Sequence, residues 1–281
     1  MDYVIQDHRH ALAIIERDEL LNRRFNEFMG AIRSITDDEL MNDYQAKRIQ
    51  HNERGTNLKS ITPSINELLK QKMLAIPGWR AEVDIFNDTT GEISNTEWRL
   101  DFACDDALCV EVAFNHGEAI AWNLLKPVLA CELNHVQKDV QGQIGIYVCA
   151  TENLKKTGNI DSASGSFEKV KRYLRPMSNQ LTIPMVIIGL KPFETFRISK
   201  HTKEIVSNNF TINQELVDRT IEITKKLDND DLEVVKGRVI SVNPPEANSR
   251  EGYTIVLEIS HRNQPEMILE RDICFVEELQ N

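Results

Sequence analysis

Two uninterrupted apolar runs constrain the fold of this chain more than any other feature. They occupy residues 144–149 and 183–189 and carry almost no polar side chain. Strands that are apolar on every position are buried on both faces, which is typical of a sheet covered by helices on both sides. Residues 167–174, between the two runs, have a helical pattern of apolar positions. The sequence therefore predicts an α/β fold with a central mixed β-sheet flanked by helices.

Shorter elements precede these runs. Residues 80–86, 97–103 and 108–114 have β character and are separated by turn segments at 87–91 and 104–106, which predicts a meander. Apolar residues at helical spacing predict one or two amphipathic helices over 11–35, a helix over 65–74 capped by Ser64, and a helix over 119–133 with a kink or new start at Pro127. The polar residues 42–60 indicate a long surface loop, either facing a ligand or disordered.

The pattern changes after Lys200, which suggests a boundary. Residues 214–227 are predicted to be helical, and residues 233–242 and 253–260 are predicted to form a pair of strands with a long connection. We expect residues 1–200 to form the α/β core. Residues 201–281 are expected to form a C-terminal extension with a small β-subdomain packed on it.

Composition excludes several classes of protein. A chain of 281 residues can bury a full core, and no apolar stretch approaches the roughly 18 residues that a membrane span requires. The first residues mix acids and bases, unlike a signal peptide, so we expect a cytoplasmic protein with no membrane partner. The five cysteines show no paired CxxC spacing, which favours buried free thiols over a zinc site.

Charge is distributed unevenly along the chain. The formal net charge of -11 argues against indiscriminate binding to nucleic acid, because phosphate neutralisation supplies most of that affinity. The segment from Asn153 to Lys200, however, contains nine Lys and Arg and only three Asp and Glu, a local net charge of +6. This asymmetry is consistent with one basic face for a specific nucleic-acid partner, and equally with a solvated helix surface.

Two carboxylates are predicted to lie close together on the strands at 97–103 and 108–114. A turn at Asp105 and Asp106 would fold the two strands into a hairpin and place Asp101 opposite Glu111. Hard divalent cations such as Mg²⁺ bind a few carboxylates plus waters, and such an ion can activate water against a phosphodiester. The alternative is a solvent-exposed hairpin with scattered acids.

The same residues lie within a longer resemblance to BglII- and BstYI-like type II restriction endonucleases of the PD-(D/E)XK nuclease superfamily. The resemblance is patchy but covers most of the chain, with its features in the same order. They are His10-Ala11 with Ile14-Ile15, Ile65-Asn-Glu-Leu with Gly78-Trp79, Leu100-Asp101-Phe102, Glu111-Val-Ala-Phe114, Ala121-Trp-Asn-Leu, Met185-Val-Ile-Ile-Gly-Leu190, Val235-Lys-Gly-Arg-Val-Ile240 and Gly252-Tyr-Thr-Ile-Val256. The resemblance implies the PD-(D/E)XK core with its central mixed sheet.

It also implies a metal site. Asp101, Glu111 and the backbone carbonyl of Val112 would be the Mg²⁺ ligands, and Glu82 falls where relatives have a further site residue. Ala113 departs from the family, which usually has Lys, Glu or Gln there to position or polarise the attacking water. Three explanations are open: a substitution introduced to trap a DNA complex, a nuclease whose polar group comes from elsewhere, with Lys126 as a candidate, or a binder that has lost catalysis.

The resemblance further implies DNA-reading loops beside this site. Asn115 and His116 follow the strand that carries Glu111, and a polar loop lies where relatives contact bases. Its candidate DNA-binding residues are Asn159, Ser162, Ser164 and Ser166. Short polar side chains can approach base edges in the major groove. The alternatives are an ordinary connection for the loop and a structural role for His116.

The function implied is a homodimeric, Mg²⁺-dependent type II restriction endonuclease that cuts double-stranded DNA at a short palindromic site, because a palindrome matches a two-fold protein. Relatives cut at sites centred on GATC, but the reading loops differ here, and the sequence specifies neither the recognition site nor methylation sensitivity. A sequence-specific DNA-binding protein without catalysis is the alternative, consistent with Ala113. A hydrolase of small phosphoesters is disfavoured by the basic segment.

Overall fold

The computed structural model describes all residues except 88–97, 105, 133–136, 246–251, 263, 280 and 281. It divides into two compact units, Met1–Pro192 and Phe193–Asn281. The boundary therefore lies eight residues before the predicted position at residue 200. The reason is that strand β7 (Phe196–Ile198) pairs with β8 (Ile205–Ser207) and so belongs to the C-terminal unit.

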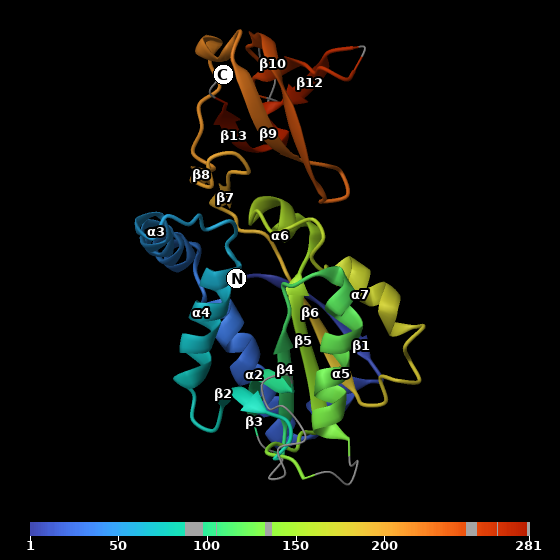
Figure 1. The fold of residues 1–281 in the computed structure, drawn as a ribbon. Helices are drawn as coiled ribbons and strands as arrows, with labels where there is room; N and C mark the ends of the chain where they lie inside the picture. The colour runs from blue at the N-terminus through green and yellow to red at the C-terminus, as the bar shows by residue number, and fades with distance from the viewer. Residues whose placement is uncertain (88–97, 105, 133–136, 246–251, 263, 280–281) are drawn as a thin grey trace. The chain divides into compact units, whose positions relative to one another are not determined.

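The N-terminal unit is an α/β structure, as predicted (Figure 1). Its strands are β1 (Tyr3–His8), β2 (Arg80–Asp84), β3 (Arg99–Cys104), β4 (Leu108–Val112), β5 (Ile144–Ala150) and β6 (Met185–Leu190). Its helices are α1 (Ala11–Arg17), α2 (Glu19–Ser34), α3 (Asp37–Glu53), α4 (Thr62–Leu74), α5 (Ile120–Cys131), α6 (Glu152–Thr157) and α7 (Phe167–Leu174), with the 3₁₀ turn η1 (Gly117–Ala119). The sheet order is β1-β6-β5-β4-β3-β2. Neighbours among β4, β5 and β6 are parallel and the other pairs are antiparallel, which makes the sheet mixed.

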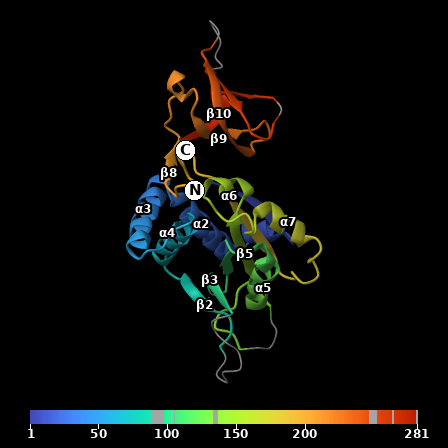
Figure 2. The same cartoon turned by 45° about the horizontal axis from the view of Figure 1, so that its top comes forward.

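The two apolar runs form the centre of this sheet. Every residue of β5 and β6 is buried, which requires cover on both faces. Helices α5 and α7 lie on one side, and α2 and α4 lie on the other (Figures 1 and 2). Gly189 allows α7 to approach, because a Cβ atom there would lie 2.6 Å from Cγ of Phe167. The strands that carry the candidate site are therefore held in a rigid, closely packed layer.

Some predictions for this unit were wrong. The polar segment 42–60 was interpreted as a loop, but most of it lies in α3. This helix begins with a capping box between Thr36 and Glu39 and buries only Leu40 and Tyr44, so it lacks the broad apolar stripe that identifies a helix in sequence. Ser64 was expected to cap the next helix, but α4 begins at Thr62 and Ser64 is buried within it.

Strand β1 is a further element that the sequence reasoning missed. It pairs antiparallel with β6 at the edge of the sheet, and its residues are partly rather than fully buried. An edge strand with polar residues gives only a weak apolar signal.

The C-terminal unit is built on a five-stranded sheet, order β12-β11-β10-β9-β13. Its strands are β9 (Thr220–Lys226), β10 (Leu232–Asn243), β11 (Thr254–Glu258), β12 (Glu266–Leu269) and β13 (Ile273–Glu278), with 3₁₀ turns η2 (Gln214–Leu216) and η3 (Glu270–Asp272). The β-subdomain and the β10–β11 pair were predicted correctly. The helix predicted over 214–227 was wrong: its second half is β9, where β-branched residues Ile221 and Ile223 pack into a sheet core that the local pattern did not reveal. The packing of this C-terminal unit on the N-terminal core remains a prediction.

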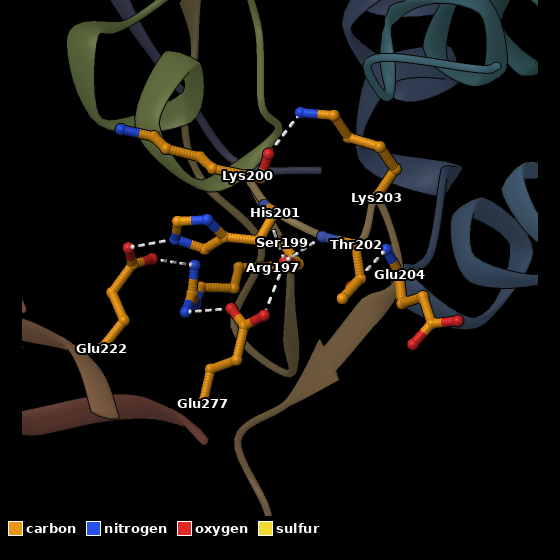
Figure 3. Close-up of polar contacts among 9 residues, drawn as sticks. All are labelled: Arg197, Ser199, Lys200, His201, Thr202, Lys203, Glu204, Glu222 and Glu277. Carbon is orange, nitrogen blue, oxygen red and sulfur yellow. Dashed lines mark hydrogen bonds and ion pairs between the residues drawn. The ribbon is translucent and has the colours of Figure 1, made fainter. Parts of the chain in front are cut away.

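A buried polar cluster fastens β7 to this sheet (Figure 3). The guanidinium of Arg197 is 2.9 Å from Glu222 of β9 and 2.7 Å from Glu277 of β13, and only 1% of Arg197 is exposed. Ser199 donates a hydrogen bond to Glu277, and the ring of His201 lies 3.2 Å from Glu222. Arg197 belongs to the segment interpreted as a basic face, so the exposed basic surface is smaller than the sequence suggested.

Two global expectations can be compared with the structure. The five cysteines are free thiols, and Cys104, Cys109, Cys131 and Cys149 are buried. Among the described residues, no helix is both long enough and apolar enough to cross a membrane.

Candidate active site

The β3–β4 hairpin brings the two predicted carboxylates together. Phe102 pairs with Val110, so the antiparallel register places Asp101 across from Glu111 one position further along. The turn is tight: Ala107 donates to the carbonyl of Cys104 at 3.1 Å, and Asp106 adopts a left-handed φ of 58°. Asp105, also predicted in this turn, lies outside the described residues. Residues opposite each other in an antiparallel pair project from the same face, so both acids lie on one patch.

Asp101 is held against the backbone of β4. Its Oδ2 accepts a hydrogen bond from the N–H of Val112 at 2.6 Å. Burial raises the pKa of Asp101, and the Val112 hydrogen bond opposes that rise. The hydrogen bond therefore keeps the carboxylate against the backbone of Val112, the residue whose carbonyl was the third predicted metal ligand.

Glu111 is the most perturbed acid of the site. It is 4% exposed, and its Oε1 is 2.8 Å from Nζ of Lys126 on α5. Its Oε2 is buried and has no hydrogen-bond partner among the described residues. Burial, and then the negative charge of Asp101, raise the pKa of Glu111 to about 8. A buried carboxylate with an unpaired oxygen, beside a second acid, favours binding of a cation.

Glu82 completes the row of acids from the neighbouring strand. The β2–β3 register pairs Ala81 with Phe102 and Val83 with Leu100, so Glu82 lies across from Asp101 without being paired to it. Its φ is 52°, in the left-handed region that a residue with a Cβ atom rarely adopts. Such strain concentrates at functional sites. The Glu82 side chain is half exposed and lies 3.4 Å from Lys70.

A pocket of about 190 Å³ opens beside these acids. It is lined by Glu82, Asp101, Phe102 and Val112 of the sheet and by Pro63, Asn66, Glu67, Leu69 and Lys70 of α4. Sequence reasoning missed the contribution of α4. The spacing of Asn66 and Lys70, one helical turn apart, places both on one face and is the only local signal for it.

These residues fit a hard divalent cation. In the described ranges, no group of three or more His, Cys, Asp or Glu side chains is arranged to hold a metal ion. A cation would therefore depend on Asp101, Glu111, the Val112 carbonyl and water, and Mg²⁺ binds in this way, with one or two carboxylates and several retained waters. The unpaired Oε2 of Glu111 is the observation that supports this fit.

Ala113 lies on the same strand face as Glu111 but contributes no polar atom. It is 3% exposed and belongs to an apolar cluster with Ile120 and Leu124 of α5. Its N–H donates to the carbonyl of Val148 at 2.8 Å. The position at which relatives are expected to carry a polar side chain is thus part of the core.

The two segments predicted to read DNA lie side by side. His116 and Ser164 form an antiparallel bridge, flanked by hydrogen bonds from Gly117 to Ala163 at 2.8 Å and from Gly165 to Asn115 at 3.0 Å. Residues 115–117 and 163–165 are therefore one structural unit directly after the strand of Glu111. Asn115 also accepts a hydrogen bond from Asn123 at 2.8 Å.

The structure divides the predicted contact residues into two groups. Asn115, His116 and Ser162 are exposed, and Asn159 is partly exposed, with its amide donating to the carbonyl of Lys59. Ser164 and Ser166 are buried, which corrects their prediction as base contacts. Ser166 caps α7 by accepting from the N–H of Lys169, and Ser164 belongs to the bridge with His116, so both support the loop rather than face a ligand.

The buried side chain of Lys155 supports this loop by hydrogen bonds to its backbone, a role that sequence reasoning missed. It was counted with the basic surface, yet only 7% of it is exposed. Its Nζ donates to the carbonyls of Ser162 at 3.0 Å and Ser164 at 2.8 Å. A buried ammonium that satisfies two carbonyls fixes the loop conformation.

Comparisons with known proteins identify the family and the fold. The family model described as "Restriction endonuclease BglII/BglIII" matches residues 3–190, which lie within the N-terminal unit. The crystal structure of restriction endonuclease BglII complexed with a DNA 16-mer is similar in fold, with a TM-score of 0.50 and 17% sequence identity over 92% of this chain and 100% of that one. No curated protein sequence matches.

Proposed function

The chain belongs to the BglII/BglIII restriction endonuclease family, and on this premise we propose that it is a type II restriction endonuclease that hydrolyses double-stranded DNA with Mg²⁺ held by Asp101 and Glu111. The observation that carries the proposal is the position of these two acids across from each other in the β3–β4 hairpin, with Glu111 buried and its Oε2 unpaired within the described part of the chain.

The chemistry needs a positive centre at this position. A bound Mg²⁺ lowers the pKa of water and neutralises charge on the phosphodiester. The protein would orient the cation through its ligands. The N–H of Val112 holds the Asp101 carboxylate by a hydrogen bond, and the Val112 carbonyl directly follows Glu111 in the chain. Glu82 lies across from Asp101 and lines the pocket, which supports a role for its carboxylate in holding water or a cation there.

The partner proposed is duplex DNA with a palindromic site. The similar solved structure is described as a DNA complex of BglII, and the joined segments 115–117 and 163–165 are the corresponding reading surface proposed for this chain. Asn115, His116, Asn159 and Ser162 are its candidate contacts. A homodimer would place one such site on each strand of a palindrome.

A second function is favoured by one observation. Ala113 supplies no polar group beside Glu111, as expected for a sequence-specific DNA-binding protein that has lost catalysis. The two functions share the same DNA surface and differ only in whether the phosphodiester bond is broken.

A cleavage assay tests the proposal. Long duplex DNA of known sequence is incubated with the protein in Mg²⁺ or in EDTA, and with Asp101→Asn. Asp106→Asn is the matched control, since it removes an exposed carboxylate in the same hairpin turn at a left-handed φ that Asn accepts. We expect discrete fragments from the unsubstituted protein and from Asp106→Asn in Mg²⁺, and none from Asp101→Asn or in EDTA.

The opposite results are informative. If the unsubstituted protein leaves DNA intact but Ala113→Gln or Ala113→Lys produces discrete fragments, position 113 alone inactivates the site. Specific DNA binding without cleavage by any of these proteins would support the non-catalytic function.

A further inference from the structure

Helix α5 carries a single charged residue, Lys126, in a helix that is otherwise apolar apart from Asn123. The helix packs on the sheet face that bears Glu111 and Ala113. The Lys126 side chain is only 17% exposed and reaches the Glu111 carboxylate, with Nζ 2.8 Å from Oε1. The cation is therefore directed into the candidate active site from the element that covers it.

An ammonium has three N–H donors, and one of them is used by Glu111. Glu111 is the only hydrogen-bond acceptor of Lys126 among the described residues. Two donors thus remain for groups that enter the site, such as water or a phosphate oxygen.

Packing alone gives little reason for this ion pair. Taking a lysine and a glutamate out of water costs several kcal/mol, and a well-packed apolar pair is often as stabilising. Neighbouring positions on α5 and directly after β4 are already apolar, including Ile120, Leu124 and Ala113. The pair is therefore better explained by chemistry at the site than by stability.

Resting on the proposed function, we infer that Lys126 is the catalytic cation of this chain and takes the role that Ala113 cannot perform. In the reaction, the oxygen of water bonds to phosphorus and one phosphoester P–O bond breaks. The water proton passes to solvent, and the leaving oxygen takes a proton from solvent. Lys126 stays protonated throughout, orients the attacking water by hydrogen bonding and stabilises the negative charge that develops on the phosphoryl oxygens.

The test compares Lys126→Met and Lys126→Arg with the unsubstituted protein. Lys47→Met is the matched control: Lys47 is similarly shielded, at 24% exposure, and pairs with Asp43 at 2.5 Å on α3. Three measurements are made on each protein: the single-turnover rate on a duplex containing the mapped cleavage site, the affinity for that duplex in EDTA, and the affinity for Mn²⁺ without DNA, by titration calorimetry.

We expect Lys126→Met to reduce the cleavage rate by about 100-fold or more, while DNA affinity changes less than about threefold. Mn²⁺ affinity should stay equal or increase, because the ammonium no longer competes for Glu111. Lys126→Arg should recover part of the rate, and so should Ala113→Lys added to Lys126→Met, which returns a cation to the same strand face. Lys47→Met should leave all three measurements unchanged.

Cleavage by Lys126→Met at the unsubstituted rate would overturn the inference. So would a fold-loss of Mn²⁺ affinity or of DNA affinity as large as the fold-loss of rate, since this would make Lys126 a structural residue. Failure of the proposed function looks different: the unsubstituted protein itself would not cut DNA, and the inference would fall with it.

Discussion

Glu111 and Lys126, fifteen positions apart in the chain, form an ion pair of 2.8 Å in which the acid is almost entirely buried. The pair joins the central sheet to the helix that covers it. It leaves one carboxylate oxygen unpaired within the described residues, so the metal-free site is an electrostatic cost to the folded state. Where structure conflicts with stability in this way, function is the usual cause.

Glu111→Gln should stabilise the metal-free protein above neutral pH. The pKa of Glu111 is about 8 in the folded state, above its ordinary value of 4.5, so the folded state binds a proton that the unfolded state releases. The contribution of this protonation to the free energy of unfolding is therefore fully present below about pH 4.5 and is lost as the pH rises to about 8. Gln keeps an oxygen for Lys126 and does not ionise. Urea unfolding in EDTA should show little difference at pH 5 and an advantage of on the order of 2 kcal/mol for Glu111→Gln at pH 8.

Glu118→Gln is the control for this measurement, because Glu118 is exposed. A constant difference between Glu111→Gln and the unsubstituted protein from pH 5 to pH 8 would contradict the prediction.

Glycine should replace Glu82 at a smaller cost in stability than alanine. At a φ of 52°, alanine retains the Cβ strain and glycine relieves it. We expect Glu82→Gly to be more stable than Glu82→Ala by about 1 kcal/mol in thermal unfolding. Both should weaken Mn²⁺ binding to the same extent, about tenfold, because both remove the carboxylate. Equal stability of the two variants would contradict the prediction, because it would mean that the backbone at position 82 leaves the left-handed region when Glu82 is replaced.

Lys155→Met should loosen the DNA-reading surface. The substitution leaves the carbonyls of Ser162 and Ser164 without their ammonium donor, at a cost of roughly 1 to 3 kcal/mol. Hydrogen exchange of residues 161–165 should accelerate, and affinity for the cognate duplex should fall about tenfold. Lys191→Met, which removes a surface lysine paired with Asp2, should change neither. Unchanged protection of the loop would exclude the supporting role of Lys155.

Arg197→Met should destabilise the C-terminal unit strongly. It would leave Glu222 and Glu277 buried without their shared cation (Figure 3), and breaking a buried pair costs about 3 to 5 kcal/mol. The triple change of Arg197, Glu222 and Glu277 to Met should recover most of that loss, because no unpaired charge remains. Limited proteolysis of the full chain measures the loss of stability through the rate of cleavage within residues 193–281. The single variant should be cut there much faster than the triple one. Equal rates would contradict the prediction.

Short-range patterns in the sequence predicted a large part of the fold. The runs that became β5 and β6, the helix at 167–174 and the β3–β4 hairpin each depend on the spacing of side chains within about ten residues, which propensity and alternation describe. The pairing of Asp101 with Glu111 follows from that same hairpin register. The failures were α3, whose polar surface hides its helix, β9, whose spacing also fits a helix, and the partly buried edge strand β1.

The sequence by itself therefore determined the α/β class, the positions of the central strands along the chain and the position of the two opposed acids, because each is encoded by neighbours along the chain. Only the tertiary structure decided the rest of the site. It placed Lys126 on Glu111, put Glu82 across from Asp101 with a strained backbone, and buried Lys155 beneath the loop it holds. These relationships join residues on different elements, and their cost or benefit depends on burial, which no local pattern specifies.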